Sequence, residues 1–359
     1  MEGNSSGNTY LVLDENSSDS YDDTGNTFQF YAWGIMANFV SVLGLIGNIL
    51  SIIVLSDRRM RSPTSCYLIS LAVYDSVVLL SMCLSLAIPT LKYKTNLLDD
   101  YFKFYPYMHV YAYPIALIAQ TGTIYTTVGF TIERYIAVCR PLHAAEMCTI
   151  SRAKKVILVI FICIVLYNVP RMMEHRVLEQ WDNVTNTTTA QIIPTDLGND
   201  QVYKTIYFIY LHLFIMFLVP FSLLFVLNLL LIRAVRKSRQ TRQEMSASRA
   251  KEHNLTVMLI AVIAAFLICQ LPSIADNILF VVGVPFNLDY IRFTTISNLM
   301  VVTNSATNFI LYCVFGKKFR KVFFRIFGCQ KCHSEMKKRG SLMTRTRWTS
   351  RLTESTKMQ

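Results

Sequence analysis

A carboxylate and a guanidinium stand side by side in Thr131-Ile132-Glu133-Arg134-Tyr135-Ile136-Ala137-Val138-Cys139-Arg140-Pro141-Leu142, where the long uncharged run 104–132 ends. A charge pair at the end of an apolar helix is a weak structural anchor, because its strength changes greatly with the water that reaches it. The same sensitivity suits a switch. Glu133, Arg134 and Tyr135 are therefore candidate switch residues.

The composition indicates a membrane protein. The chain has 359 residues, 53% of them hydrophobic and 16% charged, whereas soluble domains carry about a quarter charged residues. A helix of roughly 20 apolar residues crosses the hydrocarbon core. Seven segments qualify, of which the fourth must take length from its flanks: 24–56, 62–91, 104–132, 156–170, 205–232, 254–275 and 293–316. The predicted fold class is an all-α membrane protein, with residues 30–315 forming a seven-transmembrane helix bundle.

Charge sets the orientation of the predicted bundle. When the loops are assigned alternately to the two sides, 28 of the 35 Lys and Arg residues fall on one side, which is cytosolic by the positive-inside rule. The N-terminus is then outside, and residues 1–29 form a polar, acidic, disordered leader. Four Asn-x-Ser/Thr sequons on the outer side are predicted glycosylation sites: Asn4, Asn16, Asn183 and Asn186. We expect a multi-pass protein of the plasma membrane.

The basic C-terminal region is predicted to lie at the inner membrane surface. Residues 316–328 alternate aromatic and cationic side chains, which indicates an amphipathic membrane-surface helix. Cys329 and Cys332 follow it as candidate palmitoylation sites, and 329–359 is expected to be a disordered cytosolic tail. The net charge of +12 then reflects topology and attraction to the lipid bilayer, with no nucleic acid as partner.

Two kinds of residue within the spans need an explanation. Burying Asp75 costs about 2.5–3.5 kcal/mol on insertion scales, so its carboxylate requires hydrogen-bond donors or an ion. The candidate partners are hydroxyl and amide side chains: Thr123, Asn304, Ser305 and Asn308. Pro220 and Pro272 each remove a backbone donor from a span, so the fifth and sixth spans have built-in bending points.

Several short motifs follow one another along the chain: Gly47-Asn48, Leu71-Ala72-x-x-Asp75, Glu133-Arg134-Tyr135, Pro220, Pro272 and Asn308-x-x-x-Tyr312. In this order and spacing the set resembles the rhodopsin-like (class A) G-protein-coupled receptors, from about residue 30 to residue 330. Three short segments are similar to the corresponding segments of the invertebrate FMRFamide-type neuropeptide receptors. They are Ala119-Gln120-Thr121-Gly122-Thr123-Ile124-Tyr125, Tyr167-Asn168-x-Pro170-Arg171 and Asn304-Ser305-x-x-Asn308-Phe309.

The resemblance implies how the switch works. Arg134 would bond to Glu133 and, at rest, reach Glu252 at the start of the sixth span. Activation would swing that end of the span outward and admit a heterotrimeric G protein, with Tyr312 as a further switch residue. The implied relay residues are Ile124, Pro220, Phe266 and Pro272. Arrestin and kinases are implied as partners of the tail.

The resemblance also implies a sodium pocket built around Asp75 with Thr123, Asn304, Ser305 and Asn308. Sodium would favour the resting state only by binding that state better than the active one. No other cofactor is expected.

Several positions depart from the family pattern. His109 stands where most members have a cysteine bonded to the second outer loop, and residues 171–203 contain no cysteine. Gln270, Phe309 and Asn228 replace a usual tryptophan, proline and tyrosine. How the outer loop is fixed is therefore an open question at this point.

Side chains that are missing at two positions reduce the number of possible ligand classes. Ala116 lacks the carboxylate of amine receptors and Val302 lacks the lysine of visual pigments, which leaves a peptide, a lipid or another small molecule. The resemblance favours an extracellular amidated peptide of the Arg-Phe-amide type. Its guanidinium would meet Glu174 and Asp276, since Arg–carboxylate pairs are strong and directional. The other predicted contacts are Gln120 and Gln270 for the amide, with Tyr113, Met172 and Phe280 as an apolar wall.

Two other function classes compete with a receptor. An enzyme finds no support, because the six histidines are scattered without metal-ligand spacing and no paired nucleophile lies within a span. A seven-span channel or transporter using Asp75 as its ion site predicts a polar track, whereas 104–132 and 254–275 carry no charge.

Overall fold

The structure is a computed structural model that describes residues 27–93, 99–182, 187–240, 262–276, 278–279, 284–285 and 287–328. Predictions that lie outside the described residues concern Asn4, Asn16, Asn183, Asn186, Glu252, Phe280, Cys329 and Cys332.

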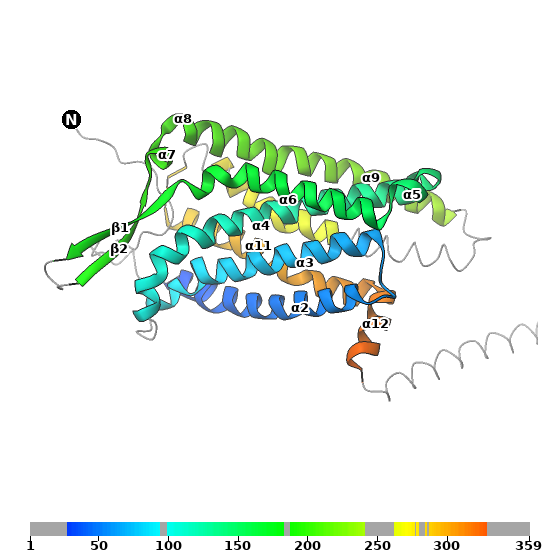
Figure 1. Ribbon diagram of the computed structural model, residues 1–359, viewed down its shortest axis with the longest axis horizontal. Helices are drawn as coiled ribbons and strands as arrows, with labels where there is room; N and C mark the ends of the chain where they lie inside the picture. The colour runs from blue at the N-terminus through cyan, green and yellow to red at the C-terminus, as the bar shows by residue number, and fades with distance from the viewer. Residues whose placement is uncertain are drawn as a thin grey trace, which may run out of the picture.

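Long helices lie side by side in one bundle (Figure 1). The first two spans are η1 (Phe30–Ala37) with α2 (Asn38–Ser56), and α3 (Pro63–Met82) extended by η2 (Cys83–Ala87) and η3 (Pro89–Tyr93). The third and fourth are α4 (Asp99–Cys139) and α6 (Ile150–Met172), joined by α5 (Pro141–Met147). The last three are η4 (Lys204–Leu211) and η5 (Leu213–Leu218) with α9 (Val219–Gln240), the helix Val262–Asp276, and α11 (Leu288–Phe315).

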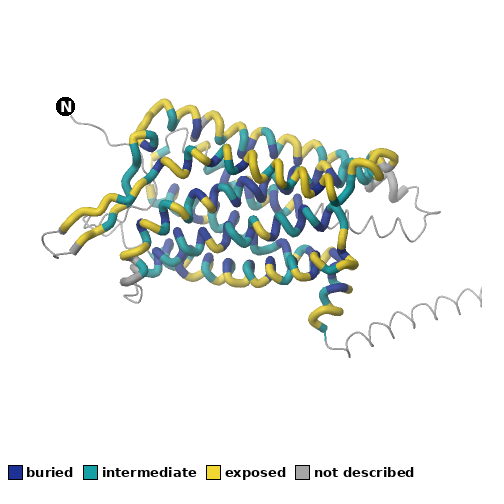
Figure 2. Tube along the Cα trace, viewed as in Figure 1, coloured by how far each residue is buried: buried dark blue, intermediate teal, exposed yellow. Residues whose placement is uncertain are grey.

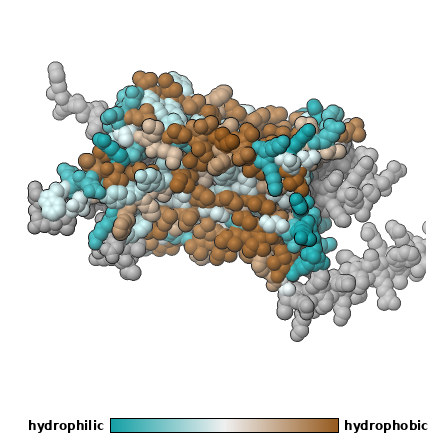
Figure 3. All heavy atoms as spheres, viewed as in Figure 1, coloured by the Kyte–Doolittle hydropathy of each residue, from teal (hydrophilic) through white to brown (hydrophobic). Residues whose placement is uncertain are grey.

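The bundle has the dimensions and surface of a membrane protein. Within the described residues, five helices are long and apolar enough to cross a membrane, and Val262–Asp276 is a shorter apolar helix. The fourth span, α6, has 23 residues and so extends for about 35 Å, with residues on both flanks of the predicted 156–170. A hydrophobic belt separates hydrophilic side chains at the two ends of the bundle (Figure 3). The predicted helical membrane bundle is confirmed.

Small residues let the first span approach the last. The Cβ of any side chain at Gly44 would lie 2.6 Å from the Ala306 Cβ, and one at Gly47 would lie 3.0 Å from the Phe309 Cβ. At this contact the Asn48 Nδ2 donates to the Ser305 carbonyl oxygen at 3.1 Å. Buried segments line these helix contacts, while the outward faces are exposed (Figure 2). The glycines therefore permit the close approach that gives a buried amide its partner.

The fifth span changes its hydrogen-bond register just before Pro220. The Val219 N–H donates to the Phe214 carbonyl, one residue further back than in an α-helix. Since Pro220 has no backbone N–H, the α-helical bond at that position is missing, and the wider turn accommodates the proline. The predicted bending point is thus a switch from π-helix to the α-helix α9.

The loop after α6 is a β-hairpin, which differs from the all-helical expectation. Strand β1 (His175–Asp182) pairs antiparallel with β2 (Thr187–Pro194), in a register from His175↔Pro194 to Asp182↔Thr187. The hairpin extends from one end of the bundle (Figure 1), and both strands contact α4. The short helices α7 (Asp196–Asn199) and α8 (Gln201–Tyr203) then return the chain to the bundle.

A short helix follows the last span, as predicted. In α12 (Lys317–Phe327), Phe319 and Val322 are buried, and the Phe319 ring lies 5.5 Å from the Tyr312 ring. Part of the apolar face thus packs on the bundle, where the sequence analysis placed all of it in lipid. Phe324 and Phe327 remain exposed.

Replacing Gly44 by valine should destabilise the bundle. The added Cβ would also lie 2.9 Å from the Ala306 Cα, a backbone atom that moves only with its helix. Overpacking of this kind costs about 1–3 kcal/mol. We expect a lower midpoint of thermal unfolding for the detergent-purified protein, whereas Leu43→Ala, at a half-exposed neighbouring position, serves as the control. An unchanged midpoint for Gly44→Val would contradict the packing described.

Candidate functional site

The charge pair at the inner end of α4 forms a fork. Arg134 donates from Nε to the Glu133 Oε2 at 2.6 Å and from Nη2 to Oε1 at 2.5 Å. The Glu133 carboxylate is buried and also accepts a hydrogen bond from the Thr64 hydroxyl of α3 at 3.2 Å. Both carboxylate oxygens are thus engaged, and two parallel charge-assisted bonds fix the guanidinium. Tyr135 lies half-buried beside the pair.

Asp75 lies fully buried in the middle of the bundle, and its carboxylate accepts hydrogen bonds from other spans. Thr123 donates to Oδ1 at 3.1 Å, Asn308 donates to Oδ2 at 2.7 Å, and Ser305 is a third donor. Among the described residues no cation pairs with this carboxylate. A cavity beside the cluster is lined by Leu71, Thr123, Thr127, Val262, Phe266, Asn304 and Asn308.

Apolar side chains connect the Asp75 level with the inner switch. Ile124 and Phe266 belong to one buried cluster with Tyr312, and the Phe266 ring stacks on Phe221 at 6.0 Å. Pro220 is buried at the start of α9, and Pro272 is half-buried in the sixth span. The Tyr312 hydroxyl is buried and has no hydrogen-bond partner in the described part of the chain.

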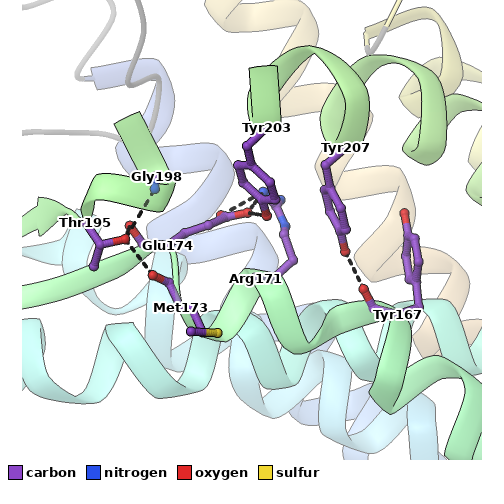
Figure 4. Close-up of polar contacts among 8 residues, drawn as sticks. All are labelled: Tyr167, Arg171, Met173, Glu174, Thr195, Gly198, Tyr203 and Tyr207. Carbon is purple, nitrogen blue, oxygen red and sulfur yellow. Dashed lines mark hydrogen bonds and ion pairs between the residues drawn. The ribbon is translucent and has the colours of Figure 1, made fainter. Parts of the chain in front are cut away.

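At the outer end of the bundle, Glu174 lies in a buried ion pair (Figure 4). Arg171 donates from Nη1 to both carboxylate oxygens, at 3.0 and 2.9 Å, and the two side chains are only 6% and 3% exposed. Tyr203 donates its hydroxyl to the Glu174 Oε1 at 2.5 Å. The Arg171 guanidinium carbon lies 6.0 Å from the centre of the Tyr113 ring. This pair is the meeting point of four segments: α4, α6, α8 and the base of the hairpin, where Glu174 directly precedes β1.

Burial shifts the pKa values of two side chains at the outer network, Tyr203 and His175. Burial raises the pKa of the Tyr203 hydroxyl, and the hydrogen bond to the Glu174 carboxylate raises it further. Burial likewise lowers the pKa of His175, the first residue of β1. Both groups are therefore neutral at physiological pH.

The two carboxylates that the sequence predicts around one ligand cation have different partners in the structure. Glu174 is held by Arg171, while Asp276 is half-buried and accepts a hydrogen bond from the Thr294 hydroxyl of α11 at 2.6 Å. Among the described residues Asp276 has no cationic partner within ion-pair distance. Its hydrogen-bond donors in the described part of the chain, Thr294 and Tyr290, are both neutral.

The other predicted ligand contacts lie in different environments. Gln270 is 2% exposed, and its Oε1 has no hydrogen-bond partner among the described residues. Gln120 and Tyr113 are half-buried on α4, whereas Met172 is 44% exposed at the end of α6.

Sequence reasoning missed the residues around Glu174. Arg171 stands out in the sequence only as part of a family motif, and no sequence pattern marks Tyr203, Tyr207 or Thr195. The spacing of Arg171 and Glu174, three residues apart at a helix end, is a signal for an ion pair. The contact with Tyr203 spans 29 residues of chain and has no local signal.

Comparison with known proteins gives a consistent result. The sequence pattern of the 7 transmembrane receptor (rhodopsin family) matches residues 47–312. The FMRFamide receptor of Drosophila melanogaster is 35% identical over 306 residues, which cover 84% of this chain and 55% of the relative. The chain thus spans about half the length of that protein.

Two further relatives match over most of the chain. The FMRFamide peptide receptor frpr-18 of Caenorhabditis elegans is 33% identical over 299 residues, covering 81% of this chain and 68% of the relative. The sex peptide receptor of Drosophila melanogaster is 26% identical over 321 residues, covering 82% and 72%.

Proposed function

The chain belongs to the rhodopsin family of seven-transmembrane receptors, and on that premise we propose that it binds an extracellular amidated peptide and activates a heterotrimeric G protein. The family is one of receptors and not of enzymes. The observation that carries the ligand class is the similarity to relatives named FMRFamide receptors, at 35% and 33% identity. The plasma membrane, with the N-terminus outside, is the location that this function requires.

The outer half of the bundle offers chemistry that suits an Arg-Phe-amide terminus. The ligand guanidinium pairs with Asp276, which is half-buried, so that the pair is partly shielded from water. The neutral amide donates to the Gln270 Oε1, a buried acceptor that has no partner within the described residues. An added donor would remove the cost of leaving that atom unsatisfied. Gln120, Tyr113, Met172 and Phe280 complete the proposed contact surface.

Replacing Asp276 by asparagine tests the cation site. A hydrogen bond to a charged group contributes about 1.5–3 kcal/mol, so we expect the potency of an Arg-Phe-amide peptide to fall about 10–100-fold. The measurement is a peptide dose–response for G-protein nucleotide exchange, with surface expression monitored. Asp289→Asn, which removes a carboxylate that is 88% exposed on α11, is the matched control.

The peptide itself provides the second half of that test. An analogue with citrulline in place of arginine lacks the charge, so it should be weak on the unmodified receptor and lose nothing further on Asp276→Asn. Equal losses for the arginine and citrulline peptides would exclude Asp276 as the cation site. Failure of every amidated peptide to stimulate a surface-expressed receptor would contradict the ligand class itself.

Signalling is proposed to proceed by outward movement of the sixth span, which frees Arg134. The fork between Glu133 and Arg134 supports this proposal, because it keeps the guanidinium within α4 and away from the cytosol. Glu252, at the start of the sixth span, supplies the second restraint on Arg134 in this proposal. Without that restraint the active arrangement is populated more often in the absence of ligand.

The substitution Glu252→Ala is therefore expected to raise ligand-independent nucleotide exchange several-fold at matched surface expression. Lys251→Ala, at the adjacent position, changes charge without removing the proposed partner and serves as the control. Flat basal activity in Glu252→Ala would mean that another contact holds the receptor at rest.

Sodium is proposed as a modulator at Asp75. The carboxylate is fully buried, has no cationic partner among the described residues and lies beside a cavity. Carboxylate, hydroxyl and amide oxygens suit a hard monovalent cation such as sodium, so the residues fit the ion. Bound sodium would balance the Asp75 charge and favour the resting receptor.

Replacing sodium by choline should then raise peptide potency about fivefold or more in the unmodified receptor. Asp75→Asn should remove that dependence on sodium. Thr307→Ala, which loses a hydroxyl bonded to its own helix at Asn304, is the control and should keep it. A full sodium effect in Asp75→Asn would place the ion elsewhere.

A further inference from the structure

The β1–β2 hairpin cannot be tied to the bundle by an intrachain disulfide of its own. Between Cys163 and Cys269 the sequence contains no cysteine. A two-stranded hairpin is marginally stable in water, so backbone pairing between β1 and β2 does not fix its position. Contacts with the bundle must therefore hold it: Tyr107 of α4 donates its hydroxyl to the Glu179 carboxylate in the middle of β1, and further contacts lie at the base of the hairpin.

Backbone and hydroxyl groups close the base of the hairpin. The Thr195 N–H donates to the Glu174 carbonyl at 2.8 Å, and the Thr195 hydroxyl donates to the Met173 carbonyl at 2.6 Å. The same hydroxyl accepts from the Gly198 N–H at 3.2 Å (Figure 4). A Cβ at Gly198 would lie 2.3 Å from the Glu174 carbonyl oxygen, so only glycine permits this approach.

The Glu174 carboxylate joins this base to the rest of the outer bundle. Arg171 reaches it from the last turn of α6, and Tyr203 reaches it from α8, across the loop. Because the pair is buried, its attraction is weakly screened by water, and loss of one partner would leave a charge without compensation. The contrast is the Arg292–Asp289 pair, also three residues apart, which is exposed and 3.6 Å long.

Aromatic rings hold the guanidinium and the tyrosine in place. Tyr203 stacks on Tyr207 at 5.3 Å, and Tyr207 stacks on Tyr167 of α6 at 5.4 Å. The Tyr207 hydroxyl donates to the Tyr167 carbonyl at 2.7 Å, and Tyr113 of α4 lies beneath Arg171. The outer ends of the third, fourth and fifth spans thus converge on the carboxylate at the hairpin base.

We propose that Arg171, Glu174 and Tyr203 form a non-covalent clamp that anchors the second outer loop to the bundle. The three are positioning residues: they fix the base of the hairpin relative to α6 and α8 by a buried ion pair with a phenol as a third member. The anchoring is therefore independent of thiol chemistry, and it depends on charge. The inference goes beyond the proposed function and does not rest on the chemistry of the ligand.

Hydrogen exchange in the purified full-length receptor tests the clamp without a ligand. In Glu174→Gln and in Arg171→Gln, amide exchange in 175–194 should accelerate by about tenfold or more, because the hairpin opens locally. The double variant carries no uncompensated charge, so its effect should not exceed that of the worse single variant. Amides of α2 and α3 should keep their protection in all three. Asp289→Asn should leave the hairpin unchanged.

Tyr203→Phe provides a milder variant should the charge variants fail to fold. It keeps the ring that stacks on Tyr207 and removes only the hydroxyl bonded to Glu174, so a smaller acceleration confined to 175–194 is expected. Reducing agent should not alter hairpin exchange in the unmodified receptor. Unchanged exchange in Glu174→Gln and Tyr203→Phe, acceleration spread evenly over the bundle, or sensitivity to reductant would each overturn the proposal.

Discussion

A carboxylate buried among membrane-crossing helices has to find its partners inside the protein, because hydrocarbon supplies none. Three acidic side chains meet this constraint in this receptor. Glu174 at the outer end pairs with Arg171, Asp75 in the middle accepts bonds from neutral side chains, and Glu133 at the inner end engages both nitrogens of an arginine fork. The choice of partner decides what each site does.

An ion pair restrains only the segments that its members belong to. Glu133 and Arg134 are adjacent on α4, so their fork by itself holds no two spans together; the Thr64 hydroxyl, at 3.2 Å from Glu133, connects it to α3. Any restraint on the sixth span must come from a residue of that span. At the outer end the Arg171–Glu174 pair does connect separate segments, because Tyr203 of α8 donates a hydrogen bond to Glu174.

The sequence predicts the parts of this structure that arise from composition and local spacing. Hydropathy located the spans, and the scarcity of polar side chains within them limited the partners of Asp75 to a few, of which Thr123 and Asn308 donate to it. The sequence predicts a polar loop over 171–203 and does not predict the hairpin there. The sequence predicts Glu174 as a ligand contact because nothing local indicates its bond to Tyr203. That bond depends on the path by which the loop returns to the bundle, and no periodic sequence pattern predicts this path.

A clamp made of charges differs physically from a covalent crosslink in its dependence on water. The attraction between Arg171 and Glu174 varies inversely with the local dielectric, so it is strong only while the two side chains, 6% and 3% exposed, stay dry. The tyrosine rings around Arg171 keep water out and so maintain that strength. Water that reached Glu174 would weaken the anchor of the loop by hydrating the pair, whereas a disulfide would hold whether the site is wet or dry. The position of the loop is thus coupled to the hydration of one buried pair.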